Sequence, residues 1–290
     1  MAVPPPIIVK LLKVQVHPCA FFCEVQKMKK PQVMGILNVT PDSFSDGGSF
    51  TSEEAIARQV KQMISDGADS IDVGGESTRP FAEPVTEQDE LNRVIPAIKI
   101  IRTISSTIPV SIDTTKASVA RAALIDGATM VNDISALRHD PEMIEIVKGY
   151  DGPVIIMHMQ GTPGDMQLKP HYEDVVDEIC TFFTDRITWL EAQGINPDRI
   201  IIDPGIGFGK TLDHNLTLLR NIQELKKLGH PVLIGHSRKS FFDKLLRIPM
   251  EKRDCPSAIV SALCAKQGAD ILRVHDVEKT VAAVRLAAVL

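Results

Sequence analysis

Short apolar runs rich in β-branched residues alternate along the chain with longer segments whose apolar residues recur at helical spacing. This alternation is typical of βα units, in which a crossover helix connects parallel strands. The runs predict eight strands, at residues 33–39, 70–74, 108–113, 129–133, 153–159, 199–205, 231–237 and 270–276.

Three of the intervening helical segments run up to a glycine, at Gly67, Gly127 and Gly194, as helices with a glycine C-cap do. The gaps between strands leave room for one crossover helix each, and no linker rich in Pro, Gly or Ser interrupts the rhythm. We therefore predict an α/β fold, a (β/α)8 TIM barrel formed as a single domain by residues 31–290. Residues 1–30 are either a short strand pair at the bottom of the barrel or an extension.

Composition narrows the possible partners and location. A net charge of -5 gives no general basic surface, so we expect no nucleic acid partner. We expect no membrane association, because no apolar run is long enough to span a bilayer, and no signal peptide, because Lys10 and Lys13 interrupt the apolar N-terminal stretch. Five cysteines without a CxxC pair fit reduced thiols in a cytoplasmic protein. Cys19 and Cys23 near His17 match no recognised zinc spacing, which favours ordinary packing.

Polar residues stand at the carboxyl ends of nearly all the predicted strands. In barrels of this kind these ends meet at one mouth and build the active site. Each residue alone could simply end a strand and cap the next helix. Together they would need a polar ligand with several N–H donors, because burying carboxylates and amides without partners is costly. The residues are Asn38, Asp72, Asp113, Asn132, His158, Asp203, His236 and Arg273.

The glycine-rich stretch 203–211 resembles a nucleotide-binding P-loop but lacks its first glycine, since Pro204 stands there. We interpret the stretch instead as a sharp turn after Asp203 that brings Phe208 near a flat ligand. Cationic residues follow the last two strands, with Lys239 after one, and Arg273 and His275 on one face of the other. They favour an anion site, since barrels often bind phosphate there. A solvated Lys239 and a structural ion pair of Arg273 are the alternatives.

Eight ordered motifs are similar to those of dihydropteroate synthases, and they cover the chain from residue 33 to its end. They read MGILNVTPDSFSDGG, DVGGESTRP, SIDT, VNDIS, MHMQGTP, DPGIGFGKT, GHSRKSF and RVHDV. The resemblance implies a (β/α)8 barrel, usually homodimeric. It also implies an enzyme that joins (7,8-dihydropterin-6-yl)methyl diphosphate to 4-aminobenzoate in a Mg2+-dependent reaction and is inhibited by sulfonamides.

The resemblance also implies roles for individual residues, in three groups. The groups that bind the pterin diphosphate are Asp113, Asn132, Asp203 and Lys239 around the ring, Met159 and Phe208 on its faces, and Thr78, Arg273 and His275. Those that bind aminobenzoate or close over the site are Phe44, Asp46, Thr78, Arg79 and Ser237. Asn38 would meet Mg2+, and the catalytic groups would be Asp113, Lys239, Arg273 and His275.

Other interpretations are weaker. A pterin-binding barrel of the methyltetrahydrofolate methyltransferase type would have no diphosphate to hold, whereas cationic motifs follow the last two strands here. A non-catalytic pterin-binding paralogue would have lost its loop or anion motifs, and an aldolase or isomerase barrel would show a strand lysine or an acid/base pair. One departure from the family is Phe81-Ala82, where Gly-Ala is common, which bears on the second loop. We interpret Asp72 as a structural strand-end residue.

Overall fold

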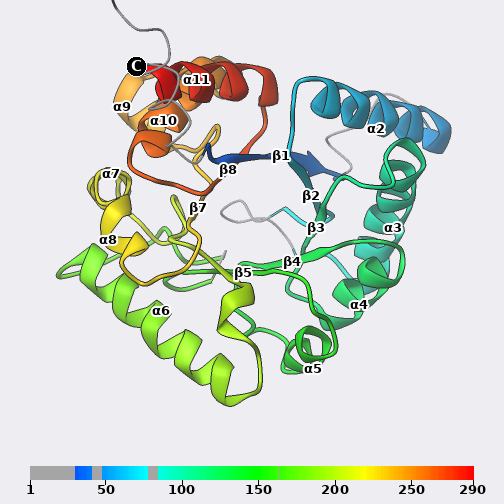
Figure 1. The fold of residues 1–290 in the computed structure, drawn as a ribbon, viewed down its shortest axis with the longest axis horizontal. Helices are drawn as coiled ribbons and strands as arrows, with labels where there is room; N and C mark the ends of the chain where they lie inside the picture. Colours follow the sequence, from blue (N-terminus) through cyan, green and yellow to red (C-terminus); the bar gives the residue numbers. More distant parts are fainter. Residues whose placement is uncertain (1–29, 41–47, 78–83, 163) are drawn as a thin grey trace, which may run out of the picture.

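The computed structural model describes residues 30–40, 48–77, 84–162 and 164–290, and its strands form a parallel barrel. Neighbouring strands follow the order β6-β5-β4-β3-β2-β1-β8-β7, and a bridge between Ile202 and Val232 brings the two outer strands together. Helices surround this ring in Figure 1. The predicted (β/α)8 barrel is therefore confirmed. The strands are β1 (Gln32–Asn38), β2 (Ser70–Gly74), β3 (Val110–Asp113), β4 (Met130–Asp133), β5 (Val154–Met157), β6 (Ile200–Asp203), β7 (Leu233–Ile234) and β8 (Ile271–Val274).

The helices end largely where the glycines predict. Gly67, Gly127 and Gly194 all have positive φ and follow helices that end two residues earlier. No helix among the described residues has the length and apolar content needed to cross a membrane. The α-helices are α2 (Gly48–Ser65), α3 (Glu87–Ile104), α4 (Ala117–Ile125), α5 (Met143–Lys148), α6 (Val175–Ala192), α7 (Leu212–Arg220), α8 (Ile222–Lys226), α9 (Phe241–Leu246), α10 (Asp254–Lys266) and α11 (Val277–Val289).

The expectation of one crossover helix per gap is wrong in the last two gaps. Between β6 and β7 the chain forms α7 and then α8, because the backbone of Asn221 (φ -122°, ψ 32°) leaves the helical region. Between β7 and β8 it forms α9, the short 3-10 helix η3 (Met250–Lys252) and α10. There Arg247 ends α9 in the left-handed conformation (φ 55°), and Pro249 follows.

The inside of the barrel has an apolar floor and a polar layer above it. Six buried side chains from six strands form the floor cluster: Met34, Met130, Ile155, Ile201, Leu233 and Ile271. Because strand residues alternate between faces, the residues two positions further along also point inward. Three of these are Asn132, Asp203 and Arg273, so the layer nearer the strand ends carries charge. A larger apolar cluster outside the strands packs them against the helices.

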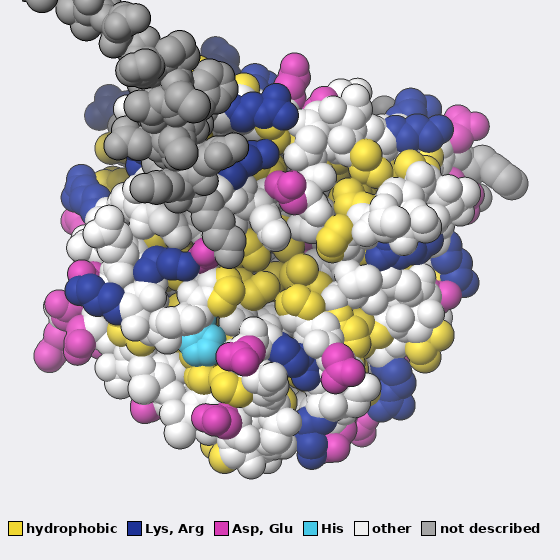
Figure 2. Space-filling view, viewed as in Figure 1, with side chains coloured by type: hydrophobic (Ala, Val, Ile, Leu, Met, Phe, Trp, Pro, Cys, Tyr) yellow, Lys and Arg dark blue, Asp and Glu magenta, His cyan; other side chains and the backbone are white. Residues whose placement is uncertain are grey.

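Figure 2 shows one face of the molecule, where hydrophobic side chains gather near the middle and charged side chains lie around them.

Candidate active site

Arg273 stands at the centre of the polar layer and holds two carboxylates. Its Nε donates to Oδ2 of Asp72 at 2.5 Å, and its Nη2 donates to Oδ2 of Asp113 at 2.6 Å. The three residues come from β8, β2 and β3, and β1 lies between β8 and β2 in the sheet. Their side chains therefore meet across the inside of the barrel.

Asp72 has more contacts than we predicted. It is fully buried, and besides Arg273 it accepts hydrogen bonds from the Asn132 amide at 3.3 and 3.4 Å. From the sequence we interpreted Asp72 as a structural residue at a strand end. In the structure its carboxylate orients the side chains of Arg273 and Asn132, which are two predicted site residues. The period-two pattern could have found it, because Asp72 lies on the same face of β2 as Gly74 at the mouth.

Asn38 and Asp113 flank Gly74. A Cβ atom added at Gly74 would lie 3.7 Å from both Oδ1 of Asn38 and Oδ2 of Asp113. Asn38 is half-buried, so its amide reaches the mouth of the barrel from β1. An amide oxygen fits a hard cation whose other ligands are diphosphate and water oxygens. The described residues contain no cluster of three His, Cys, Asp or Glu suited to a metal.

Asp203 and Lys239 form the opposite side of the polar layer. Asp203 is 7% exposed and accepts a hydrogen bond from the Gly205 amide at 2.7 Å. A Cβ at Gly235 would lie 3.6 Å from Oδ2 of Asp203 and 4.0 Å from Cδ of Arg273, so these two residues also flank a glycine. The Lys239 ammonium donates to the Ile206 carbonyl.

An apolar cluster lies beside these polar groups. It contains Ile134, Met157, Met159, Met166 and Phe208. The Lys239 Nζ lies 4.4 Å from the centre of the Phe208 ring, which links the apolar cluster to the polar layer. A flat heterocycle with polar edges matches such a surface, because its faces can contact Met and Phe while its edges reach carboxylates, amide and ammonium.

Ser237 and His275 contact each other beyond the ends of β7 and β8. The Ser237 hydroxyl lies 3.0 Å from Nδ1 of His275 and accepts from its backbone amide at 3.2 Å. Arg238, in contrast, donates to both carboxylate oxygens of Asp254 at 2.5 and 2.9 Å. Its guanidinium is therefore taken up by an ion pair, whereas Lys239 is directed to the site.

Burial shifts the ionisation of the polar layer. It raises the pKa of Asp113 to about 7, an effect that Arg273 partly offsets and Asp72 increases. It lowers the pKa of Lys239 to about 8, partly offset by Asp203. Burial likewise raises the pKa of Asp203. For Arg273, the neighbouring carboxylates outweigh burial and raise its pKa, so it stays charged.

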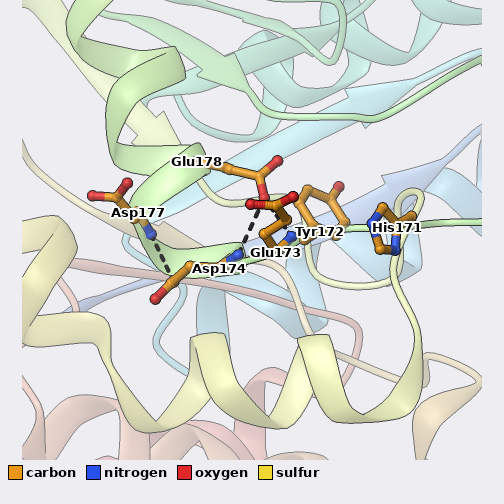
Figure 3. Close-up of a pocket in the computed structure, with 6 residues that line it drawn as sticks. All are labelled: His171, Tyr172, Glu173, Asp174, Asp177 and Glu178. Carbon is orange, nitrogen blue, oxygen red and sulfur yellow. Dashed lines mark hydrogen bonds between the residues drawn. The ribbon is translucent and has the colours of Figure 1, made fainter.

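A pocket of about 390 Å³ lies away from this layer, at the N-terminus of α6 (Figure 3). Two of its carboxylates are used within the protein. Asp174 accepts from the amides of Val176 and Asp177, and Glu178 accepts from those of Glu173 and Asp174. These contacts cap the helix, and we assign no ligand to the pocket.

The remaining predicted site residues, Phe44, Asp46, Thr78 and Arg79, lie outside the described residues, as do Phe81, Cys19 and Cys23.

Comparison with known proteins identifies the family. The model of the pterin binding enzyme family matches residues 34–275. The chain belongs to the dihydropteroate synthase family of pterin-binding enzymes. A dihydropteroate synthase of Synechocystis sp. is 49% identical over 253 residues, which cover 86% of each chain.

Solved dihydropteroate synthases share the fold as well. The Yersinia pestis enzyme, determined with a sulfonamide drug complex, is 43% identical with a TM-score of 0.84, covering 90% of this chain and 94% of its own. The Xanthomonas albilineans enzyme was determined with 4-aminobenzoic acid (46% identity, TM-score 0.83) and with 7,8-dihydropteroate (43%, 0.80). These two structures cover 89% of this chain and 92% and 93% of their own. None of these dihydropteroate synthases supports the methyltransferase or non-catalytic interpretation.

Proposed function

We propose that this protein condenses (7,8-dihydropterin-6-yl)methyl diphosphate with 4-aminobenzoate to give 7,8-dihydropteroate and diphosphate. In this reaction the methylene C–O bond breaks, the amine nitrogen forms a bond to the same carbon, and the nitrogen loses a proton. The observation that carries the proposal is the Arg273 guanidinium, held between Asp72 and Asp113 in a layer that also contains Asn132 and Asp203. Such a layer combines acceptors for a heterocycle with a cation for an anionic leaving group.

The polar layer would bind the edges of the pterin ring. Carboxylates of Asp113 and Asp203 accept hydrogen bonds from the exocyclic amine and ring N–H groups, the Asn132 amide adds a donor and an acceptor, and Lys239 donates to the ring carbonyl and N5. Phe208 and Met159 contact the ring faces. The proximity of Lys239 to the Phe208 ring supports this arrangement, because it places a donor beside the apolar cluster.

The leaving diphosphate would be held on the side of Arg273 and His275. Arg273 offers a planar fork suited to phosphate oxygens. Asn38 would contact Mg2+, which when bound neutralises charge on the diphosphate. Asp113, close to both Arg273 and Asn38, stabilises positive charge that develops on the pterin methylene as the C–O bond breaks. No general base is needed before the amine attacks in this order of events.

Aminobenzoate would bind near Ser237, with the loops of Phe44, Asp46, Thr78 and Arg79 closing over it. Loop closure of this kind excludes water from a reactive cation. Because sulfonamides mimic aminobenzoate, we expect them to compete with it for this site.

The direct test incubates the purified protein with the pterin diphosphate, 4-aminobenzoate and Mg2+, and measures dihydropteroate and diphosphate. Equal amounts of both products support the proposal. Omitting aminobenzoate separates condensation from hydrolysis, and chelating Mg2+ tests the cation. Binding of the pterin diphosphate without turnover in the complete mixture would contradict the proposed activity.

We also propose that the protein is a cytoplasmic homodimer. Helices α10 and α11 lie side by side (Figure 1) and expose apolar residues: Ile259 and Leu263 on α10, Leu286 and Val289 on α11, each 48–60% exposed. A second copy would cover this surface, since exposed apolar patches mark association sites. Analytical ultracentrifugation of the wild type and of Leu263→Lys tests the dimer, and a monomeric wild type would contradict it.

The described cysteines, Cys180, Cys255 and Cys264, are free, as in a reducing compartment, and cell fractionation tests that location.

A further inference from the structure

The loop that follows β6 is held by side chains along its whole length. Four successive carbonyls, from residue 206 to 209, each accept a hydrogen bond from a different side chain. The donors, in the same order, are Lys239, Gln167, Lys210 and Tyr172. A loop fixed in this way is preorganised, since each backbone acceptor already has a partner.

Glycines let this loop approach the end of β5. Gly205 and Gly209 have φ values of 68° and 61°, which non-glycine residues rarely adopt. A Cβ at Gly205 would lie 2.0 Å from the His158 carbonyl oxygen, and one at Gly209 would lie 2.3 Å from that of Gln160. The two backbone segments are therefore in direct contact, with no room for a side chain between them.

Lys210 joins these two segments from inside. Its side chain is 1% exposed, and Nζ lies 2.9 Å from the Phe208 carbonyl, 3.1 Å from Nδ1 of His158 and 3.4 Å from the His158 carbonyl. In its charged form the Lys210 amine has three donors and no acceptor, so these three atoms satisfy it fully. Burial lowers the pKa of Lys210 to about 7, an effect that the charge of Asp203 partly offsets, so the charged form is kept at and below neutral pH. His158 Nδ1 then acts as the acceptor, which requires a neutral ring. Burial lowers the pKa of His158 to about 3, which agrees with a neutral ring.

The arrangement is unusual because Lys210 has no ion-pair partner within 4 Å in the part of the chain that the structure describes, and the charge of Asp203 acts on it only from a longer distance. Burying an ammonium is costly, and buried lysines generally have a carboxylate partner. Lys210 instead contacts only neutral acceptors, on the residue before Met159 and on Phe208 itself. Met159 and Phe208 belong to the apolar cluster beside the polar layer. The ammonium thus connects the backbones of the two residues assigned to the faces of the pterin ring.

We propose that Lys210 is a positioning residue that fixes the spacing of Phe208 and Met159, and thereby tunes the affinity for the flat heterocycle of the pterin substrate. The proposal rests on the proposed function, because it assumes that the ring binds beside Phe208. Lys210 itself does not touch the substrate, since its side chain is enclosed beneath the loop.

The test replaces Lys210 by Met, which keeps the length of the side chain and removes its donors. We expect Lys210→Met to raise the KM for the pterin diphosphate about 10-fold, because small misplacements of binding groups are costly, while the KM for aminobenzoate changes less than about twofold. Lys227→Met is the matched control, since Lys227 is an exposed lysine whose side chain is 69% accessible, and both constants should stay unchanged. Equal increases in both KM values, or no increase, would overturn the proposal.

A double-mutant cycle separates positioning from general loss of stability. In a Phe208→Ala background the ring contact is already absent, so Lys210→Met should change the pterin KM less than about twofold. Full additivity of the two effects would count against the proposal. Should Lys210→Met fail to fold, His158 supplies a second pair. His158→Leu removes one acceptor and should raise the pterin KM. His158→Asn keeps an acceptor near the position of Nδ1, so its pterin KM should stay close to that of the wild type.

Calorimetry of pterin diphosphate binding to the wild-type protein and to Lys210→Met separates the proposed function from the proposed role of Lys210. Absence of wild-type binding would refute the proposed function, whereas equal affinities of the wild type and Lys210→Met would refute only the role of Lys210.

Discussion

The Arg273 guanidinium donates to the Asp113 carboxylate at 2.6 Å, although 160 residues separate the two along the chain. This pair places a fixed cation next to a carboxylate at the point where we propose that the diphosphate leaves and positive charge develops. A substitution at either residue therefore removes one of the two charges and leaves the other in place.

Removing the charge of Asp113 should slow the reaction more than it weakens binding. Asp113→Asn keeps an oxygen acceptor for Arg273 and for the pterin but removes the negative charge that stabilises the cation. We expect kcat to fall by about 100-fold, as for the loss of one electrostatic contact in a transition state, with less than about threefold change in Kd. Single-turnover rates and calorimetry measure the two quantities. A matched loss in both would argue against the catalytic role.

The pH dependence of activity should be narrow. Asp113, with a pKa of about 7, is neutral below that pH and ionised above it, whereas Lys239, with a pKa of about 8, is charged below that pH and neutral above it. If both charges are needed, kcat/KM rises with pH through about 7 and falls through about 8.

The variant Lys239→Arg identifies the alkaline limb. Arginine stays protonated over this range, so the decline near pH 8 should disappear from the profile, whatever the absolute rate. A profile that still declines near pH 8 would mean that another group causes the limb.

Asp72 should affect substrate binding through its neighbours. Asp72→Asn places an amide where Arg273 and Asn132 both donate, so one donor loses its acceptor. We expect the pterin diphosphate KM to rise about 10-fold and the free energy of unfolding to fall by about 1–3 kcal/mol. Glu145→Gln, on a side chain 70% exposed, is the control and should leave both unchanged. A stability loss with an unchanged KM would limit Asp72 to support of the fold.

The contact between the loop that follows β6 and the segment that follows β5 can be tested with two glycines of similar conformation. Gly209 and Gly229 both have positive φ, at 61° and 83°. A Cβ at Gly229 meets nothing within 4 Å, whereas one at Gly209 lies 2.3 Å from a carbonyl oxygen. Gly229→Ala should lower the free energy of unfolding by about 1 kcal/mol, and Gly209→Ala by about 2 kcal/mol more. Denaturant titrations measure both, and equal losses would contradict the close approach.

Much of the fold could be predicted from the sequence because the apolar runs recur regularly and the glycines mark where helices end. The division at Asn221 could not, since it depends on a change of backbone conformation that has no distinctive sequence signal. The break after α9 has such a signal in Pro249, which the expectation of one helix per gap did not use. β7 is also shorter than predicted, at two residues. Its predicted run begins at Pro231, which has no amide hydrogen to donate.

The site was predictable where barrel geometry alone decides it. Residues at strand ends converge, so the meeting of Asp113 with Arg273 followed from the strand assignment. The partners of Lys210 did not follow, because one of them, His158, is 52 residues away along the chain. The same holds for Asp72, whose identity as a strand-end aspartate does not distinguish a capping residue from one that orients Arg273.

Fewer residues pair between β6 and β7 than between any other neighbouring strands of the barrel. These two strands share only the bridge of Ile202 with Val232, whereas β1 and β2 pair over five residues. We call this junction the seam. Asp203 lies on one side of this seam and Lys239 on the other. A bound heterocycle that reaches both would therefore connect the two edges of the wall and suppress its local opening. The Ile202 amide, which donates to the Pro231 carbonyl across the seam, should then exchange with solvent more slowly when substrate is bound.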